Sequence, residues 1–149
     1  MPGLPDGEIL QVGPRSAVTL IVVTAAVVER DGRFLVTRRQ RGVHLEGLWE
    51  FPGGKCEPGE DYETCLAREL NEELAVGVRV SDEVFATTHA YSDRAVELHF
   101  LRCELLGDPS PQVGQEVRWV SRADLVTLEF PPADAELIRL LTTGRTAAR

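Results

Sequence analysis

Apolar residues in the first third of the chain form two runs that predict paired strands. The run from Ala17 to Glu29 is rich in valine, threonine and isoleucine, which favours a buried strand. Asp31-Gly32 is a hairpin-turn signal, so the segment from Arg33 to Thr37 is the expected return strand. Residues 1–16 contain several prolines and glycines without periodicity, which predicts a flexible leader with at most a short strand near Glu8 to Val12.

The middle of the chain changes to a helical period. Leu66, Leu70 and Leu74 recur every four residues, which predicts an amphipathic helix with one buried face. Asp61 precedes this run, and its side chain is of the type that caps a helix N-terminus. Upstream, the alternation of aromatic and acidic residues over 49–51 is typical of a short, half-buried strand.

The second half of the chain predicts more strands and two further helices. The expected strands are Val76–Val80, Val84–Tyr91, Ala95–Leu106 and Gln115–Val120. Ser121 can cap a short helix that ends at Leu125, and Pro131-Pro132 opens a last helix that Gly144 ends. The apolar face of this last helix is expected to comprise Ala135, Leu137, Ile138, Leu140 and Leu141.

Length and composition are those of one compact domain. The chain has 149 residues, of which 43% are hydrophobic and 27% are charged, as is ordinary for a soluble globular protein. We therefore expect a single domain over residues 17–143, preceded by the leader and followed by a frayed tail of residues 144–149. The longest apolar run is too short to span a membrane, and the N-terminus lacks the basic and apolar regions of a signal peptide.

Charge and cysteine content narrow the classes of function. The net charge of −8 argues against binding to duplex nucleic acid, which requires a basic surface. Cys56, Cys65 and Cys103 show no paired spacing such as Cys-x-x-Cys, so we expect reduced thiols in a cytoplasmic protein. The sequence leaves open whether the protein is a monomer or a homodimer.

Three carboxylates crowd one face of the predicted central helix. Glu69, Glu72 and Glu73 stand at i, i+3 and i+4, on a different face from the leucines. Like charges at this spacing destabilise a helix unless a cation lies between them. Crowded oxygen ligands suit Mg²⁺, Ca²⁺ or Mn²⁺, and the alternative interpretation is a solvated acidic face.

The residues around these acids favour a metal site. Gly54 and Glu60 precede the acids, Arg68 comes directly before Glu69, and Val76 follows. The pattern resembles the Nudix box, which reads Gly, five residues, Glu, seven residues, then Arg-Glu-apolar-any-Glu-Glu-any-Gly-apolar. The matching positions are Gly54, Glu60, Arg68, Glu69, Leu70, Glu72, Glu73 and Val76.

One position departs from the box, at the end of the helix. Ala75 stands where the family has glycine, and a glycine just past a helix commonly adopts the left-handed conformation that closes it. Alanine in that conformation costs roughly 1–2 kcal/mol. We therefore expect the helix to close differently, at Gly77, and the carboxylates to be unaffected.

The resemblance extends from about Val18 to about Leu141 and is to MutT-type Nudix hydrolases. It includes Arg38-Arg39, the segment from Leu48 to Lys55, and Phe130–Ala133. It implies an α+β fold, an α/β/α sandwich around a central curved mixed sheet. Members hydrolyse a nucleoside diphosphate linked to a further group, and MutT-type members convert nucleoside triphosphates, often oxidised ones, into monophosphate and pyrophosphate.

Carried over position by position, the resemblance implies a set of metal ligands for Mg²⁺ or Mn²⁺. This set is the Gly53 carbonyl and the carboxylates of Glu69, Glu72 and Glu73. Arg68 would orient a neighbouring glutamate, with Glu69 as the expected partner, and Glu60 would support the cluster. The metal lowers the pKa of bound water, and a carboxylate, either Glu69 or Glu72, takes the proton.

Other positions match the substrate side of the family. Arg39 and His44, in a loop with several arginines, and Phe51 match residues that contact substrate, although a solvated loop would also carry such charges. Asp134 stands where the MutT prototype has an asparagine that reads the base. An ionised aspartate only accepts hydrogen bonds, which favours the donor edge of guanine or the cytosine amino group, whereas a protonated one also donates. The alternative role for Asp134 is an acid favoured by a helix dipole.

The leading functional prediction is a magnesium-dependent nucleoside triphosphate pyrophosphohydrolase that sanitises oxidised nucleotides such as 8-oxo-dGTP. Alternatives are cleavage of CTP or 5-substituted dCTP, hydrolysis of another nucleoside diphosphate linkage, and a catalytically silent nucleotide sensor. An acid that many MutT-type enzymes carry is replaced by Val113, and Glu116 is the nearest acid. Glu116 is either a metal-linked substitute or a surface glutamate on a strand.

Overall fold

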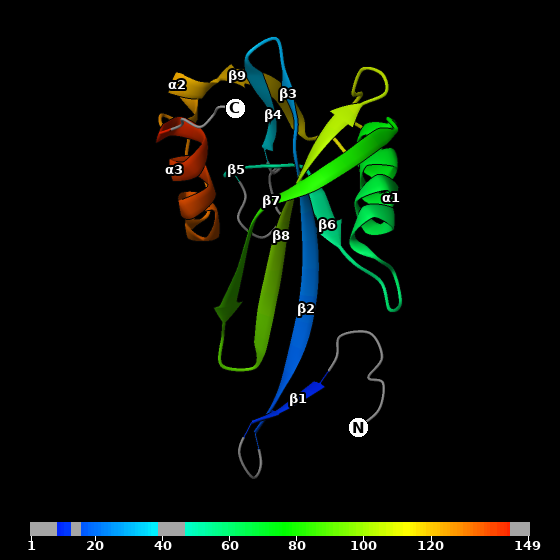
Figure 1. Ribbon diagram of the computed structural model, residues 1–149, viewed down its shortest axis with the longest axis vertical. Coiled ribbons are helices and arrows are strands. Elements are labelled where there is room, and N and C mark those ends of the chain that lie inside the picture. Colours follow the sequence, from blue (N-terminus) through cyan, green and yellow to red (C-terminus); the bar gives the residue numbers. More distant parts are fainter. Residues whose placement is uncertain (1–8, 13–15, 39–46, 144–149) are drawn as a thin grey trace.

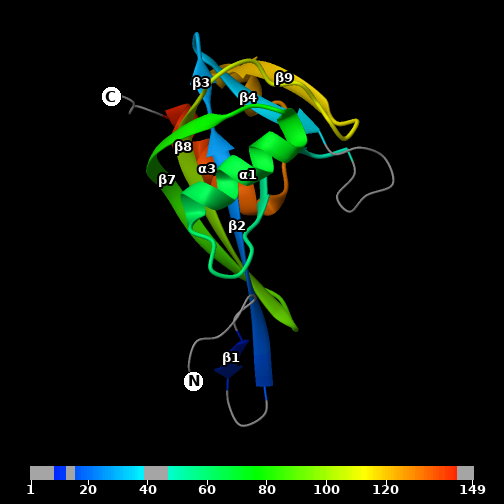
Figure 2. The same cartoon turned by 90° about the vertical axis from the view of Figure 1, so that its right-hand side faces the viewer.

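The computed structural model describes residues 9–12, 16–38 and 47–143. Helix α1 covers one side of the strands, and α2 and α3 cover the other (Figures 1 and 2). The helices are α1 (Tyr62–Leu74), α2 (Arg122–Leu125) and α3 (Ala135–Thr143), with a 3₁₀ turn at Pro132–Asp134. The strands are β1 (Ile9–Val12), β2 (Ser16–Val27), β3 (Glu29–Arg30), β4 (Arg33–Arg38), β5 (Trp49–Glu50), β6 (Gly53–Lys55), β7 (Val78–Ala90), β8 (Arg94–Leu105) and β9 (Glu116–Ser121).

The strands form two sheets. The larger has the order β1-β2-β8-β7, with β6 paired to β2, and it is mixed because β2 and β8 run parallel while the other pairs are antiparallel. The smaller sheet is antiparallel, with the order β3-β4-β5 and with β9 paired to β4. The predicted α/β/α sandwich with a central mixed sheet is confirmed.

Alternating residues of the strands divide the core into two layers. On β2, Ala25 and Val27 belong to the layer that contains Leu137 and Leu141 of α3, whereas Ala26 packs with the leucines of α1. This alternation follows from the two-residue period of a strand. All three α1 leucines, Leu66, Leu70 and Leu74, are fully buried, so the predicted apolar face of α1 is confirmed.

Several local signals in the sequence have the expected structure. Asp31 and Gly32 both have positive φ, at 54° and 76°, as a tight hairpin turn between two twisted strands requires. The Asp61 side chain accepts a hydrogen bond from the Thr64 backbone N–H at 2.7 Å and so caps α1. Ser121 caps α2 in the same way, through the Asp124 N–H.

Two expectations about elements were wrong. The strands expected on either side of residues 81–83 are one strand, β7, because irregularities in register between Val80 and Phe85 let it continue pairing with β8. On α3, Ala135 and Leu140 are exposed instead of buried. Since α3 is short, it reaches the core through one row of side chains, Leu137 and Leu141.

The end of α1 also differs from expectation. Ala75 itself takes the left-handed conformation, with φ 52° and ψ 42°, and its N–H donates to the Asn71 carbonyl, so the helix does not close at Gly77. The loop before β9 satisfies the last carbonyls of the helix, since the Ser110 N–H donates to the Leu74 carbonyl at 2.8 Å. These contacts hold the chain in place where its backbone conformation is unfavourable.

The ends of the chain are described in part. The short strand expected near the N-terminus is present as β1, which pairs with the first residues of β2, away from the helices (Figure 1). The remainder of the predicted leader and the tail from Gly144 onward lie outside the described residues. In the described part of the chain, no helix is long and apolar enough to cross a membrane.

Candidate active site

The buried leucine face of α1 fixes the direction of its charged side chains. Because the leucines point into the core, Arg68, Glu69, Glu72 and Glu73 lie on the remaining faces. The Glu69 side chain is only 13% exposed, whereas that of Glu72 is 58% exposed. The helix therefore presents one sheltered carboxylate and one open carboxylate, a single turn apart.

Glu69 is sheltered by the glycine-rich strand β6. Gly54 lies opposite Thr24 of β2, and a Cβ atom added at Gly54 would overlap the Glu69 carboxylate. At Gly53 an added Cβ would overlap the backbone of Thr24. Both glycines are thus required by close approach of neighbouring atoms, since neither has a positive φ.

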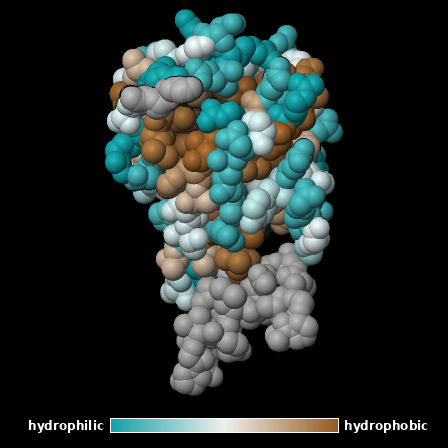
Figure 3. Space-filling model, viewed as in Figure 1, coloured by the Kyte–Doolittle hydropathy of each residue, from teal (hydrophilic) through white to brown (hydrophobic). Residues whose placement is uncertain are grey.

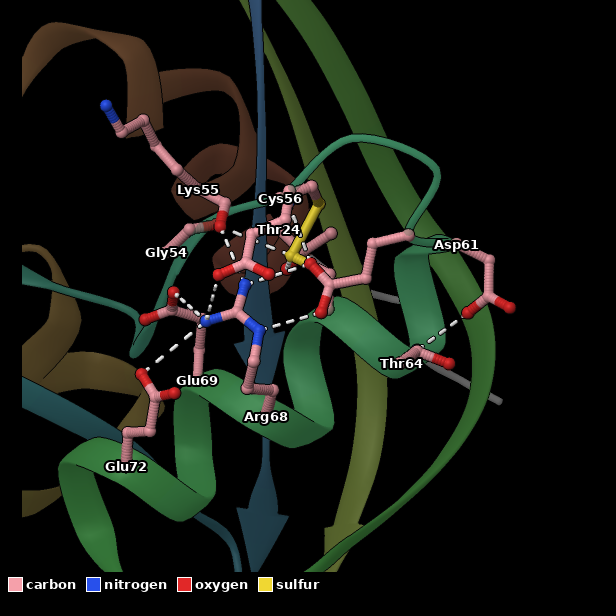
Figure 4. Close-up of a disulfide and its surroundings, with 12 residues drawn as sticks. Thr24, Gly54, Lys55, Cys56, Asp61, Thr64, Arg68, Glu69 and Glu72 are labelled. Atoms are coloured by element: carbon pink, nitrogen blue, oxygen red, sulfur yellow. Dashed lines mark hydrogen bonds and ion pairs between the residues drawn. A yellow bond between two sulfur atoms is a disulfide. The ribbon is translucent and has the colours of Figure 1, made fainter. Parts of the chain in front are cut away.

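Arg68 is the centre of the polar network around these residues (Figure 4). Its guanidinium group donates two hydrogen bonds to the Glu60 carboxylate, from Nε at 2.7 Å and from Nη2 at 2.9 Å. Nη1 donates to Glu69 at 2.9 Å and to Glu72 at 3.5 Å, and Nη2 also donates to the Lys55 carbonyl at 3.0 Å. Arg68 therefore contacts Glu69 as expected, but its bidentate partner is Glu60.

Within this network, Arg68 and Glu60 stabilise each other in the charged form. The hydrogen bonds from Arg68 are the main reason why the pKa of Glu60 is lowered from 4.5 to about 2, and the Glu57 N–H also contributes. The same hydrogen bond to Glu60, followed by the one to Glu69, raises the pKa of Arg68 above its ordinary value. At neutral pH Arg68 and Glu60 consequently form an ion pair that connects the loop after β6 to α1.

The acids of α1 offer a donor set for a hard divalent cation. Glu69 and Glu72 approach the same guanidinium nitrogen, so their carboxylates face a common region of positive charge. Glu73 is half-buried in the last turn of the helix. Among the described residues, a single group of three or more histidine, cysteine or acidic side chains has all of its potential metal-ligating atoms within 4.8 Å of one another, and it consists of Cys56, Glu60 and Cys65. The carboxylates of Glu69, Glu72 and Glu73 do not converge this closely.

The two cysteines of that group are bonded to each other. Cys56 follows β6, Cys65 lies in α1, and the two form a disulfide across a Cα–Cα distance of 5.2 Å. The expectation of reduced thiols is therefore wrong for this pair, whereas Cys103 is free and buried. The spacing in the sequence carried no signal for this disulfide, because only the folding of the loop against α1 brings the two residues together.

An aromatic cluster lies on the other face of the strands. The ring of Phe51 stacks on Phe130 with centroids 5.3 Å apart, and it meets the edge of Phe100 at 6.0 Å. The Trp49 N–H donates to the Glu129 carbonyl at 2.8 Å, which holds the segment before α3 beside β5. Figure 3 shows apolar side chains gathered on this face of the molecule, between α3 and β7.

Asp134 follows Phe130 by four residues, at the end of the 3₁₀ turn before α3. It is 6% exposed, and burial raises its pKa to about 7, with a further contribution from the negative charge of Glu50. A carboxyl group with this pKa exists in both protonation states near neutral pH. It can therefore act as an acceptor only, or as a donor and an acceptor.

The remaining predicted site residues are Arg39, His44 and the alternatives at Val113 and Glu116. Arg39 and His44 lie outside the described residues. Val113 is exposed, and the carboxylate of Glu116 pairs with Arg118 at 2.9 Å and with Arg38 at 3.6 Å, on the surface of the smaller sheet. These ion pairs favour the interpretation of Glu116 as a surface glutamate on a strand.

Known proteins resemble this chain in sequence and in structure. The model of the NUDIX domain family matches residues 23–140. The CTP pyrophosphohydrolase of Escherichia coli K12 is 34% identical over 129 residues, which are 86% of this chain and 96% of that protein. The 8-oxo-dGTP diphosphatase of Haemophilus influenzae is 35% identical over 125 residues, 82% of this chain and 91% of that protein. The solution structure of MutT from methicillin-resistant Staphylococcus aureus 252 has a TM-score of 0.71 and 31% identity, over 85% of this chain and 98% of that one.

The region matched by the family runs from within β2 to within α3, so it contains both the acidic helix and the aromatic cluster. The relatives are similar over most of their own length as well as over most of this chain. The match thus extends well beyond the short acidic pattern and includes most of both sheets and helices, with β1 and the start of β2 outside the residues that the family model matches. On these grounds the chain belongs to the Nudix hydrolase family and is of the MutT type.

Proposed function

We propose that this protein hydrolyses nucleoside triphosphates to monophosphate and pyrophosphate, and so removes unwanted nucleotides from the pool. One observation carries the proposal: the Glu69 carboxylate, enclosed by Gly54 and held by Arg68, lies beside the open carboxylate of Glu72. Such an arrangement provides one oxygen ligand in a fixed position and a second that is open to solvent, both of the type that binds the metal ions that accompany a polyphosphate.

The donor set fits Mg²⁺, with Mn²⁺ as a substitute. Glu69, Glu72 and Glu73 would hold the metal together with the Gly53 carbonyl, and all of these are the hard oxygen ligands that both ions prefer. When bound, the metal would draw charge from the phosphate oxygens and lower the pKa of a bound water. In this role the surrounding protein has to keep the carboxylates ionised and correctly oriented.

Arg68 and Glu60 would supply that orientation. Arg68 fixes one oxygen of Glu69, and Glu60 in turn fixes Arg68 through two hydrogen bonds. Mutation of a residue that hydrogen-bonds a metal ligand commonly lowers metal affinity or activity by about 10–100-fold. Glu72 is the better-placed base, because protonation of Glu69 would weaken a short hydrogen bond to Arg68 whereas Glu72 is exposed and more weakly held.

Phe51 and Asp134 would form the site for the base. Phe51 is two residues from Gly53, so the aromatic cluster and the carboxylates are joined by a short segment of chain. An ionised Asp134 could accept two hydrogen bonds from guanine N1–H and N2–H but only one such bond from cytosine, and a protonated Asp134 could pair with either base. We therefore propose 8-oxo-dGTP as the substrate and keep CTP or 5-methyl-dCTP as the second candidate, which the similarity to a CTP pyrophosphohydrolase favours.

The test is steady-state kcat/KM with Mg²⁺ over a panel of 8-oxo-dGTP, dGTP, CTP, 5-methyl-dCTP and ADP-ribose, with pyrophosphate and phosphate release measured separately. Glu72→Gln should abolish turnover. Glu63→Gln is the matched control, since Glu63 is an exposed acid on the same helix outside the acidic cluster, and it should retain activity. Failure to release pyrophosphate from any triphosphate would refute the proposal.

A further inference from the structure

The disulfide between Cys56 and Cys65 fastens the glycine-rich loop to the helix that carries the acids. Cys56 is anchored on the strand side, because its N–H donates to the Val22 carbonyl at 2.8 Å. Cys65 is fully buried on α1, with its sulfur 3.2 Å from the Thr24 hydroxyl oxygen. Figure 4 shows the bond between the sulfurs directly beside the network of Arg68.

The disulfide and Arg68 secure the same loop. Arg68 binds the Lys55 carbonyl immediately before Cys56, and it binds the Glu60 carboxylate within the loop that the disulfide closes. The disulfide is a covalent link between the loop and α1, and the contact between Arg68 and Glu60 is an ionic one. If the covalent fastening is lost, the position of Glu60 against Arg68 depends on charge and hydrogen bonds alone.

We propose that Cys56 and Cys65 are a reversible redox pair, and that their reduction by a dithiol loosens the loop carrying Glu60 and weakens the binding of divalent metal to α1. The effect on metal binding rests on the proposed function, whereas the redox pair itself does not. The proposal gives this Nudix domain a thiol–disulfide exchange site next to its acidic helix.

The two sulfurs differ in burial, and this difference determines which of them a reducing thiolate attacks. Cys56 is half-buried and Cys65 is fully buried, so an incoming thiolate would attack the sulfur of Cys56. The disulfide bond breaks, Cys65 leaves as a thiolate that the Thr24 hydroxyl can stabilise by donating a hydrogen bond, and it then takes up a proton. The second thiol of the reductant attacks the mixed disulfide and releases Cys56, so two electrons pass to the protein and the reductant becomes a disulfide.

The first measurement is a titration of the full chain in mixtures of reduced and oxidised dithiothreitol, quenched in denaturant with an alkylating reagent and read by intact mass. Because Cys103 is free, the oxidised protein should carry one label and the reduced protein three. The two additional labels should appear together and disappear again on reoxidation. In Cys103→Ala the same transition should run from no label to two. Failure of the pair to reoxidise would overturn the proposal.

The second measurement is the affinity for Mn²⁺ in the absence of substrate, determined by paramagnetic resonance. Mn²⁺ is chosen because it prefers oxygen ligands to thiols, so the thiols released by reduction should not bind it. Reduction should weaken binding by about tenfold, the lower end of the effect of losing a supporting partner. Cys56→Ser should show the weaker affinity in both conditions, and Cys103→Ser should behave as the unmodified chain.

Hydrogen exchange of the Glu57 and Glu60 amides provides a readout that requires neither metal nor turnover, since these amides are bonded within the loop. Reduction should accelerate their exchange while amides of the larger sheet stay protected. Unchanged exchange together with unchanged Mn²⁺ affinity would overturn the proposal. A protein that cleaved no triphosphate but showed redox-dependent Mn²⁺ binding would refute the proposed function and support the redox pair.

Discussion

The carboxylate of Glu69 occupies the space that a side chain at position 54 would need. The glycine of the loop and the acid of the helix are therefore parts of one packing arrangement, although they lie on different elements. Arg68 completes this arrangement by donating to the Glu69 oxygen at 2.9 Å. The geometry of the site thus depends on the absence of a Cβ atom at position 54.

Gly54→Ala tests this relationship. The added methyl group should displace Glu69 from Arg68 and lower kcat/KM by about 10–100-fold, the range for losing a group that orients a metal ligand. Gly77→Ala is the matched control, because a Cβ there would meet only the Leu106 side chain at an ordinary distance of 3.6 Å. Steady-state assays on both variants would check the prediction, and equal activities would contradict it.

The ion pair of Arg68 and Glu60 predicts a loss of stability in acid. Because the pKa of Glu60 is lowered to about 2, the pair contributes fully above the unfolded value of about 4.5 and is lost as the pH falls from there towards 2. Glu60→Gln should therefore be less stable than the parent at neutral pH and should lose less stability over this window. Urea unfolding from pH 6 to 2 measures this.

Glu63→Gln is the control for that titration, since Glu63 is exposed on the same helix, and its stability should follow the parent. Asp61, whose pKa is also lowered by its capping hydrogen bond to Thr64, is present in all three proteins. The negative charge of Glu60 raises the pKa of Asp61, so the Asp61 contribution is the same in the parent and in Glu63→Gln and moves to lower pH in Glu60→Gln. Parallel curves for Glu60→Gln and the parent would show that the ion pair contributes nothing to acid stability.

Features governed by local physics were predictable from the sequence. The four-residue spacing of Leu66, Leu70 and Leu74 allows only one buried face on a helix, and the cap at Asp61 depends only on its neighbours in the chain. The acidic cluster could be recognised for the same reason, since the positions of acids on a helix face follow from spacing alone.

Features that depend on contacts between distant segments were missed. The disulfide exists only because the loop after β6 folds back on α1, and the continuous strand β7 exists because β8 offers it a partner across an irregular register. The left-handed Ala75 is held by a loop from beyond residue 107. In each case, tertiary contacts outweigh the preference of the local sequence.

Ala75→Gly should stabilise the protein. A left-handed conformation costs alanine roughly 1–2 kcal/mol, and glycine adopts it without this cost but loses more entropy on folding. We expect a net gain of about 0.5–1 kcal/mol in the free energy of unfolding, measured by urea denaturation, with unchanged kcat/KM. Gly77→Ala, which carries the reverse substitution where φ is not positive, should not show a corresponding loss. A less stable Ala75→Gly would mean that the backbone at this position is not strained.

The raised pKa of Asp134 predicts that stability falls as the pH rises, which is opposite to the effect of Glu60. Its pKa is raised from 3.8 to about 7, so between these values the unfolded chain has released a proton that the folded chain still binds. Stability should therefore fall as the pH rises across this window, by on the order of 2–4 kcal/mol. Asp134→Asn should remove this slope in unfolding measurements from pH 4 to 8. A slope that persists in the variant would place its origin in another group.

The same protonation should alter the choice of base. If Asp134 reads the base as proposed, its protonated form below pH 7 can donate and accept and would pair with guanine or cytosine, whereas its ionised form above pH 7 would accept two hydrogen bonds only from guanine. The ratio of kcat/KM for 8-oxo-dGTP to that for CTP should thus rise several-fold between pH 6 and 8. Because the side chain at position 134 cannot ionise in Asp134→Asn, the ratio for this variant should stay constant over this range. Any effect of pH on metal binding that both substrates share cancels in the ratio. A ratio that changed equally in the parent and in Asp134→Asn would exclude Asp134 as the group that reads the base.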